Sequence, residues 1–147
     1  MSKRIHNCLE PLYLDKSRQY EQTSHFKPKG LWYGFDDSWQ KWCEGEQPNW
    51  IYQHFYELKP NGSNLLILQT SDDIIRFNKE YGGRPILPDI KIIEQIDWMR
   101  VACEYDGIEI PAYFFEFRLH FLWFYGWDCA SGAIWNLEKV DVVEIKK

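Results

Sequence analysis

The apolar segments of this chain are short, and turn-forming residues separate them from one another. Short runs that alternate or are rich in β-branched and aromatic residues are typical of strands. The Asn61-Gly62 pair predicts that two of these runs form a hairpin. Strands outnumber helices and do not alternate strictly with them, which favours an α+β fold. The expected strands cover residues 8–14, 30–34, 50–58, 64–70 and 107–110, with one or two more within 132–146.

Three segments have the features of helices. A short helix is expected to begin at Ser38, which follows two aspartates and precedes aromatic residues at helical spacing. A second helix is expected over 72–81, with Ser71 as its cap and a Gly-Gly pair at its end. A third is expected over 90–105, whose apolar residues share one helical face: Ile92, Ile93, Ile96, Met99 and Cys103.

Aromatic residues make up 18% of the chain and include eight tryptophans, which is well above ordinary usage. The length of 147 residues fits a single domain, 1–147, with a core of its own. A formal net charge of −5 disfavours a long phosphate backbone as the main partner, because such partners select a basic face. Lys3, Arg4, Lys27 and Lys29 could form a small basic patch, although solvated surface is the favoured interpretation.

The four cysteines lie far apart in the sequence, at Cys8, Cys43, Cys103 and Cys129. They form no C-x-x-C pair and have no histidine at the spacing of a zinc site, so we expect free thiols and no metal. The N-terminal residues lack the apolar core of a signal peptide, and no apolar run is long enough to span a bilayer. We therefore expect a protein of the reducing cytoplasm with no membrane partner.

Two parts of the chain resemble motifs of the ADP-ribosyltransferase fold. This family includes the catalytic domains of poly(ADP-ribose) polymerases and bacterial and phage ADP-ribosyltransferases. The stretch GLWYGFDDSWQKWC, residues 30–43, is similar to the family's signature strand and the aromatic-Cys pair that follows it. Gly30, Leu31, Trp32 and Tyr33 match that strand position by position. EYDGIEI and SGAIWNLEKV, residues 104–110 and 131–140, are similar to the family's later turn and final strand.

The resemblance implies mixed or antiparallel split β-sheets with flanking helices, and NAD as the substrate. It implies that Tyr33 and Trp42 form an aromatic wall for the nicotinamide ring, with Gly30 allowing close approach of the backbone. Trp32 is the alternative wall residue, because strand alternation sends it and Tyr33 to opposite faces and at most one of them lines the cleft. His25 could bind a ribose hydroxyl, although a surface or capping role is favoured.

The chain departs from the family in the first strand. There the family usually carries an Arg or a His-Gly pair that holds the nicotinamide side of NAD, whereas the matching stretch here is PLYLDKS, residues 11–17. Leu14 stands where the Arg or His is expected, and the adjacent Tyr13 is the candidate contact to NAD in this stretch.

The acid at the head of the last strand also differs. The family's catalytic Glu aligns with Ser131, which could hydrogen-bond the ribose but supplies no charge. Breaking the bond to nicotinamide passes through an oxocarbenium-like state that a nearby carboxylate stabilises. Asp128, in the loop GWDCASG, is the first candidate, with an Asx turn as an equally weighted alternative. Glu109 is the second acid to test, although its strand position more often faces solvent.

The block 113–127 contains nine aromatic residues, more than one strand can bury, so some are expected at the surface. Such a patch can bind a protein partner or stacked bases.

The resemblance predicts transfer of ADP-ribose from NAD to a protein or nucleic acid, as in a toxin or effector. The departures favour instead a non-catalytic module that binds a nucleotide, a sugar polymer or a protein. Hydrolysis of NAD is a third hypothesis.

Overall fold

The computed structural model describes residues 2–87 and 90–146. The helices of this part are α1 (Ser38–Glu46), α2 (Ser71–Tyr81) and α3 (Trp98–Glu104). The strands are β1 (Arg4–Cys8), β2 (Ser24–His25), β3 (Leu31–Phe35), β4 (His54–Pro60), β5 (Leu65–Ile67), β6 (Arg84–Leu87), β7 (Ile90–Asp97), β8 (Gly107–Ile110), β9 (Ser131–Ile134) and β10 (Val140–Ile145). Short 3₁₀ helices connect them: η1 (Pro48–Trp50), η2 (Phe115–Arg118), η3 (Leu122–Gly126) and η4 (Leu137–Lys139).

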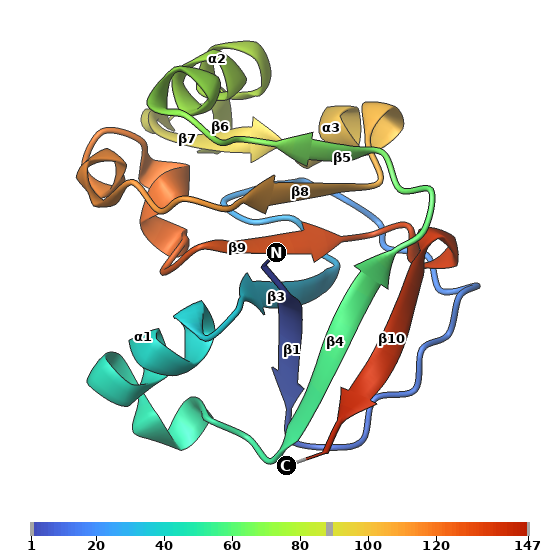
Figure 1. Cartoon of the computed structure of the whole chain (residues 1–147). Helices are drawn as coiled ribbons and strands as arrows, with labels where there is room; N and C mark the ends of the chain where they lie inside the picture. Colours follow the sequence, from blue (N-terminus) through green and yellow to red (C-terminus); the bar gives the residue numbers. More distant parts are fainter. Residues whose placement is uncertain (1, 88–89, 147) are drawn as a thin grey trace.

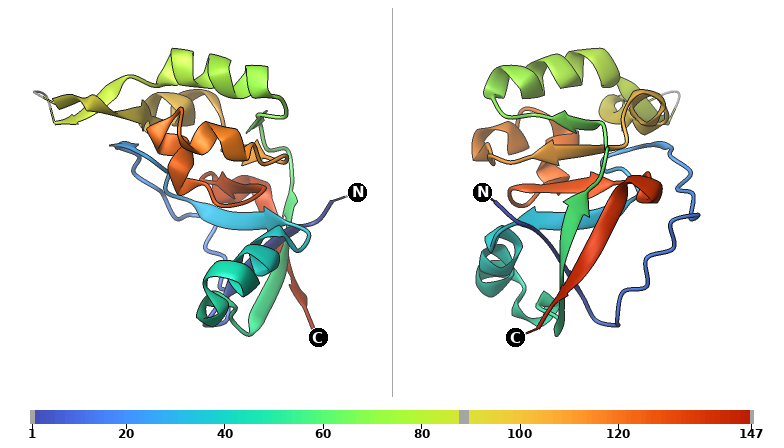
Figure 2. Two further views of the ribbon diagram at one scale, coloured as in Figure 1. Left: turned by 90° about the vertical axis from the view of Figure 1, so that its left-hand side faces the viewer. Right: turned by 45° about the vertical axis from the view of Figure 1, so that its right-hand side comes forward.

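Seven strands form one mixed sheet in the order β10-β4-β1-β3-β9-β8-β5, and β2, β7 and β6 form a smaller sheet. The β5–β8 pair is parallel, whereas the other pairs of the large sheet are antiparallel. The large sheet twists, so that β1, β4 and β10 run across the direction of β8 and β9 (Figure 1). α2 lies near the β5 edge, α1 lies beside β3, and the β6–β7 hairpin extends away from the large sheet (Figures 1 and 2). The chain is thus one small domain of mixed α and β structure, as the sequence predicts.

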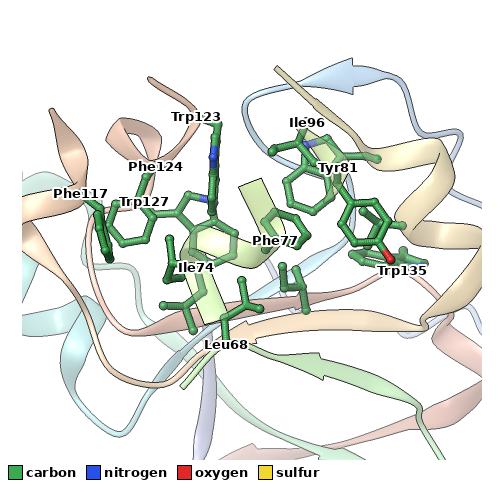
Figure 3. Close-up of a cluster of buried hydrophobic side chains, with 14 residues drawn as sticks. Leu68, Ile74, Phe77, Tyr81, Ile96, Phe117, Trp123, Phe124, Trp127 and Trp135 are labelled. Carbon is green, nitrogen blue, oxygen red and sulfur yellow. The ribbon is translucent and has the colours of Figure 1, made fainter. Parts of the chain in front are cut away.

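Two hydrophobic clusters pack against the strands. The first is dominated by rings from α2, α3 and the aromatic block, among them Phe77, Trp98 and Trp123 (Figure 3). The second surrounds Leu58 and contains Tyr33. Trp32 packs against the first cluster, so the two adjacent rings of β3 lie on opposite faces, as strand alternation predicts.

The aromatic block 113–127 forms η2 and η3 rather than a strand. Its inner residues complete the first cluster, since Trp123, Phe124 and Trp127 are at most 2% exposed. Phe115 and Tyr125 are 69% and 54% exposed. The prediction that some rings of this block reach the surface is therefore confirmed.

The prediction that 50–58 and 64–70 form a hairpin is wrong. A turn does form at Gly62, whose φ is +70°, but β4 pairs on its two sides with β1 and β10. Because both edges of β4 are occupied, β5 cannot return along it and pairs in parallel with β8 instead.

The helix expected over 90–105 is also wrong in its first half. Ile90–Asp97 is strand β7, which pairs with β2 and β6, and the helix begins only at Trp98. β-branched residues suit a strand, and the Asp97 side chain accepts a hydrogen bond from the Arg100 amide, which starts the helix there. Met99, expected on the buried face, is 53% exposed.

The first strand lies nearer the N-terminus than predicted, at Arg4–Cys8. Pro11 follows it, and a proline cannot donate a ladder hydrogen bond. The expected strand residues Tyr13 and Leu14 lie in the connecting segment, where Leu14 packs against the second cluster. At α2 the cap is Thr70, one residue before the predicted Ser71.

Candidate functional site

The stretches near residues 30 and 130 lie side by side. β3 and β9 pair antiparallel, with Tyr33 opposite Gly132 and Gly34 opposite Ser131 (Figure 1). Only glycine fits at position 132, because a Cβ there would lie 2.8 Å from the Tyr33 hydroxyl. A cavity of about 250 Å³ lies at this junction, and β1 contributes to it from the other side of β3. Its lining residues are Ile5, His6, Asn7, Lys27, Trp32, Tyr33, Gly34, Trp39, Tyr52, Trp127, Asp128, Cys129 and Ser131.

Three indole rings line the cavity, together with the phenol rings of Tyr33 and Tyr52. Trp32 and Trp127 meet edge to face, with ring centroids 5.0 Å apart, and Trp39 contributes from the first turns of α1. Trp42, the predicted wall residue, does not line the cavity but stacks on Trp39 at 5.1 Å. The resemblance implied that Trp42 of this helix forms the wall, whereas Trp39 is the tryptophan of α1 that lines the cavity.

Tyr33, the other predicted wall residue, borders the cavity but directs its hydroxyl elsewhere. That hydroxyl donates a hydrogen bond to Glu109 Oε1 at 2.8 Å, and the side chain belongs to the second hydrophobic cluster. Trp32 and Tyr33 both line the cavity, so the expectation that at most one of them does is wrong, and Trp32 supplies the flat ring from β3.

His6 lies in the middle of β1 and reaches the cavity. Its Nδ1 lies 2.6 Å from the Trp32 carbonyl oxygen, which can only accept, so Nδ1 carries the proton. Burial lowers the pKa of His6, although this hydrogen bond works in the opposite direction. A neutral His6 then has a free lone pair on Nε2, which can accept a hydrogen bond from a ligand.

Lys27 and Asp128 are the charged residues that line the cavity. Lys27 Nζ lies 5.2 Å from the centre of the Trp32 ring, and its stem lies against Gly126, where a Cβ would be 3.2 Å from Lys27 Cε. Burial lowers the pKa of Lys27, and the charge of Asp128 opposes this. Burial raises the pKa of Asp128, and the charges of Lys27 and Arg118 oppose it. The ammonium group of Lys27 and the carboxylate of Asp128 therefore both lie in a poorly solvated environment. Pairs of ionisable groups with shifted pKa values are common at functional sites.

Ser131 and Cys129 border the cavity without offering a reactive group. The Ser131 hydroxyl donates to the Cys129 carbonyl at 2.9 Å, so its proton is already used within the chain. Burial raises the pKa of Cys129 to about 11, which keeps it as the thiol at neutral pH.

Glu109 lies outside the cavity, which removes it as a candidate for contact with a ligand there. It is 2% exposed and pairs with the Arg4 guanidinium, while Tyr33 donates to it as well. The expectation that it faces solvent is wrong, because Arg4 and Tyr33 satisfy the buried carboxylate. Arg4 is accordingly part of an ion pair and not of a solvated basic patch.

Three further candidates do not line the cavity. His25 is exposed, and its carbonyl accepts a hydrogen bond from Trp98 Nε1 at 2.9 Å. A Cβ on Gly30 would lie 2.9 Å from the Ile134 carbonyl oxygen, so this glycine allows close packing of β3 on β9. Tyr13 is 89% exposed and lies in the segment after β1.

Sequence reasoning missed nine of the thirteen lining residues, among them His6, Lys27, Trp39 and Trp127. His6 was missed because the first strand was placed too late in the sequence. The run RIHNC offers no clear strand signal, because the polar residues His6 and Asn7 are adjacent and break the alternation. Lys27 was taken as solvated surface, and nothing in its local sequence indicates otherwise.

Among residues 2–87 and 90–146, no group of three or more His, Cys, Asp or Glu side chains is placed to hold a metal ion. The same part of the chain has no helix with the length and apolar character to cross a bilayer. No protein-family model matches the sequence, and the searches of curated proteins and of solved structures found no match.

Proposed function

We propose that this protein binds NAD in the cavity between β1, β3 and β9 and transfers ADP-ribose to a macromolecular acceptor. One observation carries the proposal: a single cavity is lined from both stretches that resemble the family, with Trp32 from one and Ser131 from the other, and Asp128 lines it from the loop just before Ser131. Stretches about a hundred residues apart share a cavity only if the fold brings them together.

The shape and lining of the cavity suit the nicotinamide end of NAD. A volume of about 250 Å³ is below the usual range for a whole drug-sized ligand, so it accommodates one end of a dinucleotide. The rings of Trp32, Trp39 and Trp127 offer flat surfaces to the nicotinamide ring. The first-strand Arg or His of the family has a counterpart in His6, because β1 is Arg4–Cys8 rather than 8–14. Nε2 of His6 accepts a hydrogen bond from a ribose hydroxyl in this proposal.

Asp128 supplies the negative charge for the reaction. It is the acidic side chain that lines the cavity among the described residues. As nicotinamide leaves, positive charge develops at the anomeric carbon, and a poorly solvated carboxylate stabilises it more strongly than one in water. Lys27, on the same cavity wall, is the cation available to the diphosphate of NAD.

The test measures two products from the same reaction. Wild-type protein is incubated with NAD labelled in its adenylate part and a cell lysate, and both nicotinamide release and labelled macromolecules are followed. Asp128→Asn should lower both by about 100-fold or more, the cost of removing a preorganised electrostatic group. Asp72→Asn, an exposed carboxylate in the first turn of α2, is the matched control and should leave both unchanged. If the wild type releases no nicotinamide and labels no macromolecule, the proposal is refuted.

A non-catalytic binding module is the second candidate. Ser131 stands where the family's catalytic Glu is expected. Its hydroxyl donates a hydrogen bond to the Cys129 carbonyl oxygen and carries no negative charge. Calorimetry that shows NAD binding with no nicotinamide release would favour this module. Nicotinamide release without any labelled macromolecule would favour hydrolysis of NAD.

A further inference from the structure

Three indole rings pack against one another at the surface formed by α1 and η1. The centroids of Trp39 and Trp42 are 5.1 Å apart with an interplanar angle of 18°, and those of Trp39 and Trp50 are 6.3 Å apart with an angle of 23°. Trp42 and Trp50 also meet, at 5.9 Å. We call Trp39, Trp42 and Trp50 the tryptophan stack.

The tryptophan stack is not part of the core. The buried residue of α1 is Cys43, whereas Trp39 and Trp42 are half-buried and Trp50 is 44% exposed. A large exposed aromatic surface of this kind usually serves binding. The stack is continuous with the cavity, because Trp39 belongs to both and Tyr52, also a lining residue, is 36% exposed just after η1.

The charges around the stack are mostly negative. Lys41 is the one basic residue between positions 36 and 52, and it is 3.2 Å from Asp37 in an ion pair. Four exposed acidic residues lie in this segment: Asp36, Asp37, Glu44 and Glu46. Such a surface repels a phosphate backbone and attracts cations. The face of an indole is also the best aromatic partner for a cation, and arginine is the cation that most often stacks on it.

We propose that the tryptophan stack and its acidic surroundings form a docking surface for an arginine-rich segment of a partner protein. Guanidinium groups of that segment stack on Trp50 and Trp42, and Glu44 and Glu46 attract its charge. Docking there places the partner beside the cavity that Trp39 lines. The further conclusion that this partner is the acceptor of ADP-ribose rests on the proposed function, whereas the docking itself does not.

The test titrates the full chain at low salt, by calorimetry and without NAD. The probes are a dodecapeptide of alternating Arg and Gly, the same peptide with Glu in place of Arg, and a thymidine dodecanucleotide. The arginine peptide should bind, and added salt should weaken its binding. Trp50→Ala should weaken it by about tenfold, the size of one good cation–π contact. Trp50→Phe, which keeps a flat ring, should retain part of the affinity.

The matched control is Tyr125→Ala, which removes an exposed ring from η3, outside the stack. It should bind the arginine peptide as the wild type does. A Glu44→Gln, Glu46→Gln double variant should bind more weakly than the wild type. Because Trp50 does not line the cavity, Trp50→Ala and the wild type should release nicotinamide at the same rate when no macromolecular acceptor is added and ADP-ribose passes to water.

Several results would overturn the inference. No binding of the arginine peptide, equal binding of the acidic peptide, or preferential binding of the oligonucleotide would each do so. Unchanged affinity in Trp50→Ala would show that the peptide binds elsewhere. A chain that binds the arginine peptide through Trp50 but never cleaves NAD would leave the docking surface standing and refute the proposed function alone.

Discussion

Glu109 has almost no contact with solvent, and its carboxylate oxygens are taken up by Arg4 and Tyr33. Glu109→Ala leaves the Arg4 guanidinium and the buried Tyr33 hydroxyl without their partner. We expect the free energy of unfolding to fall by about 3 kcal/mol, the lower end for breaking a buried ion pair. The lower end applies because the Arg4 side chain keeps 26% of its surface exposed. Urea denaturation measures the change.

A structural role for Glu109 also makes a prediction about activity. Nicotinamide release per folded molecule should be the same in Glu109→Gln and in the wild type, since the residue lies outside the cavity. A large loss of rate in a variant that is still folded would return Glu109 to the list of catalytic candidates.

Asp128 should make stability depend on pH in a defined direction. Burial raises its folded pKa above the ordinary 3.8, so the folded state holds this proton to higher pH than the unfolded state does. Its contribution to stability therefore falls as pH rises from 3.8 through the folded pKa. Asp128→Asn should be more stable than the wild type at pH 7, by about 1 kcal/mol or less because the residue is only half-buried.

The measurement compares urea denaturation of Asp128→Asn and the wild type at several pH values. The difference should shrink as the pH falls below 3.8, because the wild-type carboxyl then becomes protonated in both states. An Asn variant that is less stable at pH 7 would contradict the expected cost of the buried charge. Greater stability of an inactive variant would fit a charge that is retained for function.

At the scale of elements, α2 begins with a reciprocal cap. The Thr70 hydroxyl accepts a hydrogen bond from the Asp73 amide, and the Asp73 carboxylate accepts one from the Thr70 amide. Thr70→Ala should lower the free energy of unfolding by about 1 kcal/mol. Ser71→Ala is the matched control, because Ser71 is exposed and is not the capping residue. Thermal denaturation of the two variants distinguishes them, and equal losses would contradict the cap.

Element types were predictable where the signal is local. β3, α2, β8 and the last two strands lie close to their predicted positions, because Gly, Asp and cap residues end each run. β7 was not predictable from periodicity, since the isoleucines of 90–97 suit one face of a helix and also a strand. The partner of β5 was not predictable either, because it depends on which strands already occupy the edges of β4.

The residues of the candidate site also divide into those that the local sequence indicates and those that depend on tertiary structure. Trp32 was predicted because it lies within a motif that resembles the family, and Asp128 because it is the nearest acidic residue before the other motif. His6, Lys27 and Trp39 become neighbours of these residues only through the pairing of β1 with β3 and the packing of α1. Such contacts are set by tertiary structure and leave no mark on the local sequence.

At the scale of the whole molecule, the first hydrophobic cluster joins elements that are distant in the sequence. Phe77 of α2 packs its ring against Tyr81, Trp98 and Trp123, which belong to α2, α3 and η3 (Figure 3). Phe77→Ala should lower the free energy of unfolding by about 3–5 kcal/mol, through lost burial and the cavity left behind. That loss is a large share of the roughly 5–15 kcal/mol that holds a domain together.

The control for Phe77 lies on the same helix. Ile75 is 46% exposed, so Ile75→Ala should change the free energy of unfolding by about 0.5 kcal/mol or less. Urea denaturation followed by tryptophan fluorescence measures both. A Phe77→Ala variant as stable as Ile75→Ala would mean that the cluster does not join α2 to the rest of the molecule.

The central place of β1 in the large sheet has a consequence for biosynthesis. β1 is synthesised well before strand β9 and the Trp127–Asp128 wall, which complete its cavity. Pairing between such distant segments is slow to form, because long loops must close first. A nascent chain therefore cannot form the complete cavity until the residues of β9 have also been synthesised.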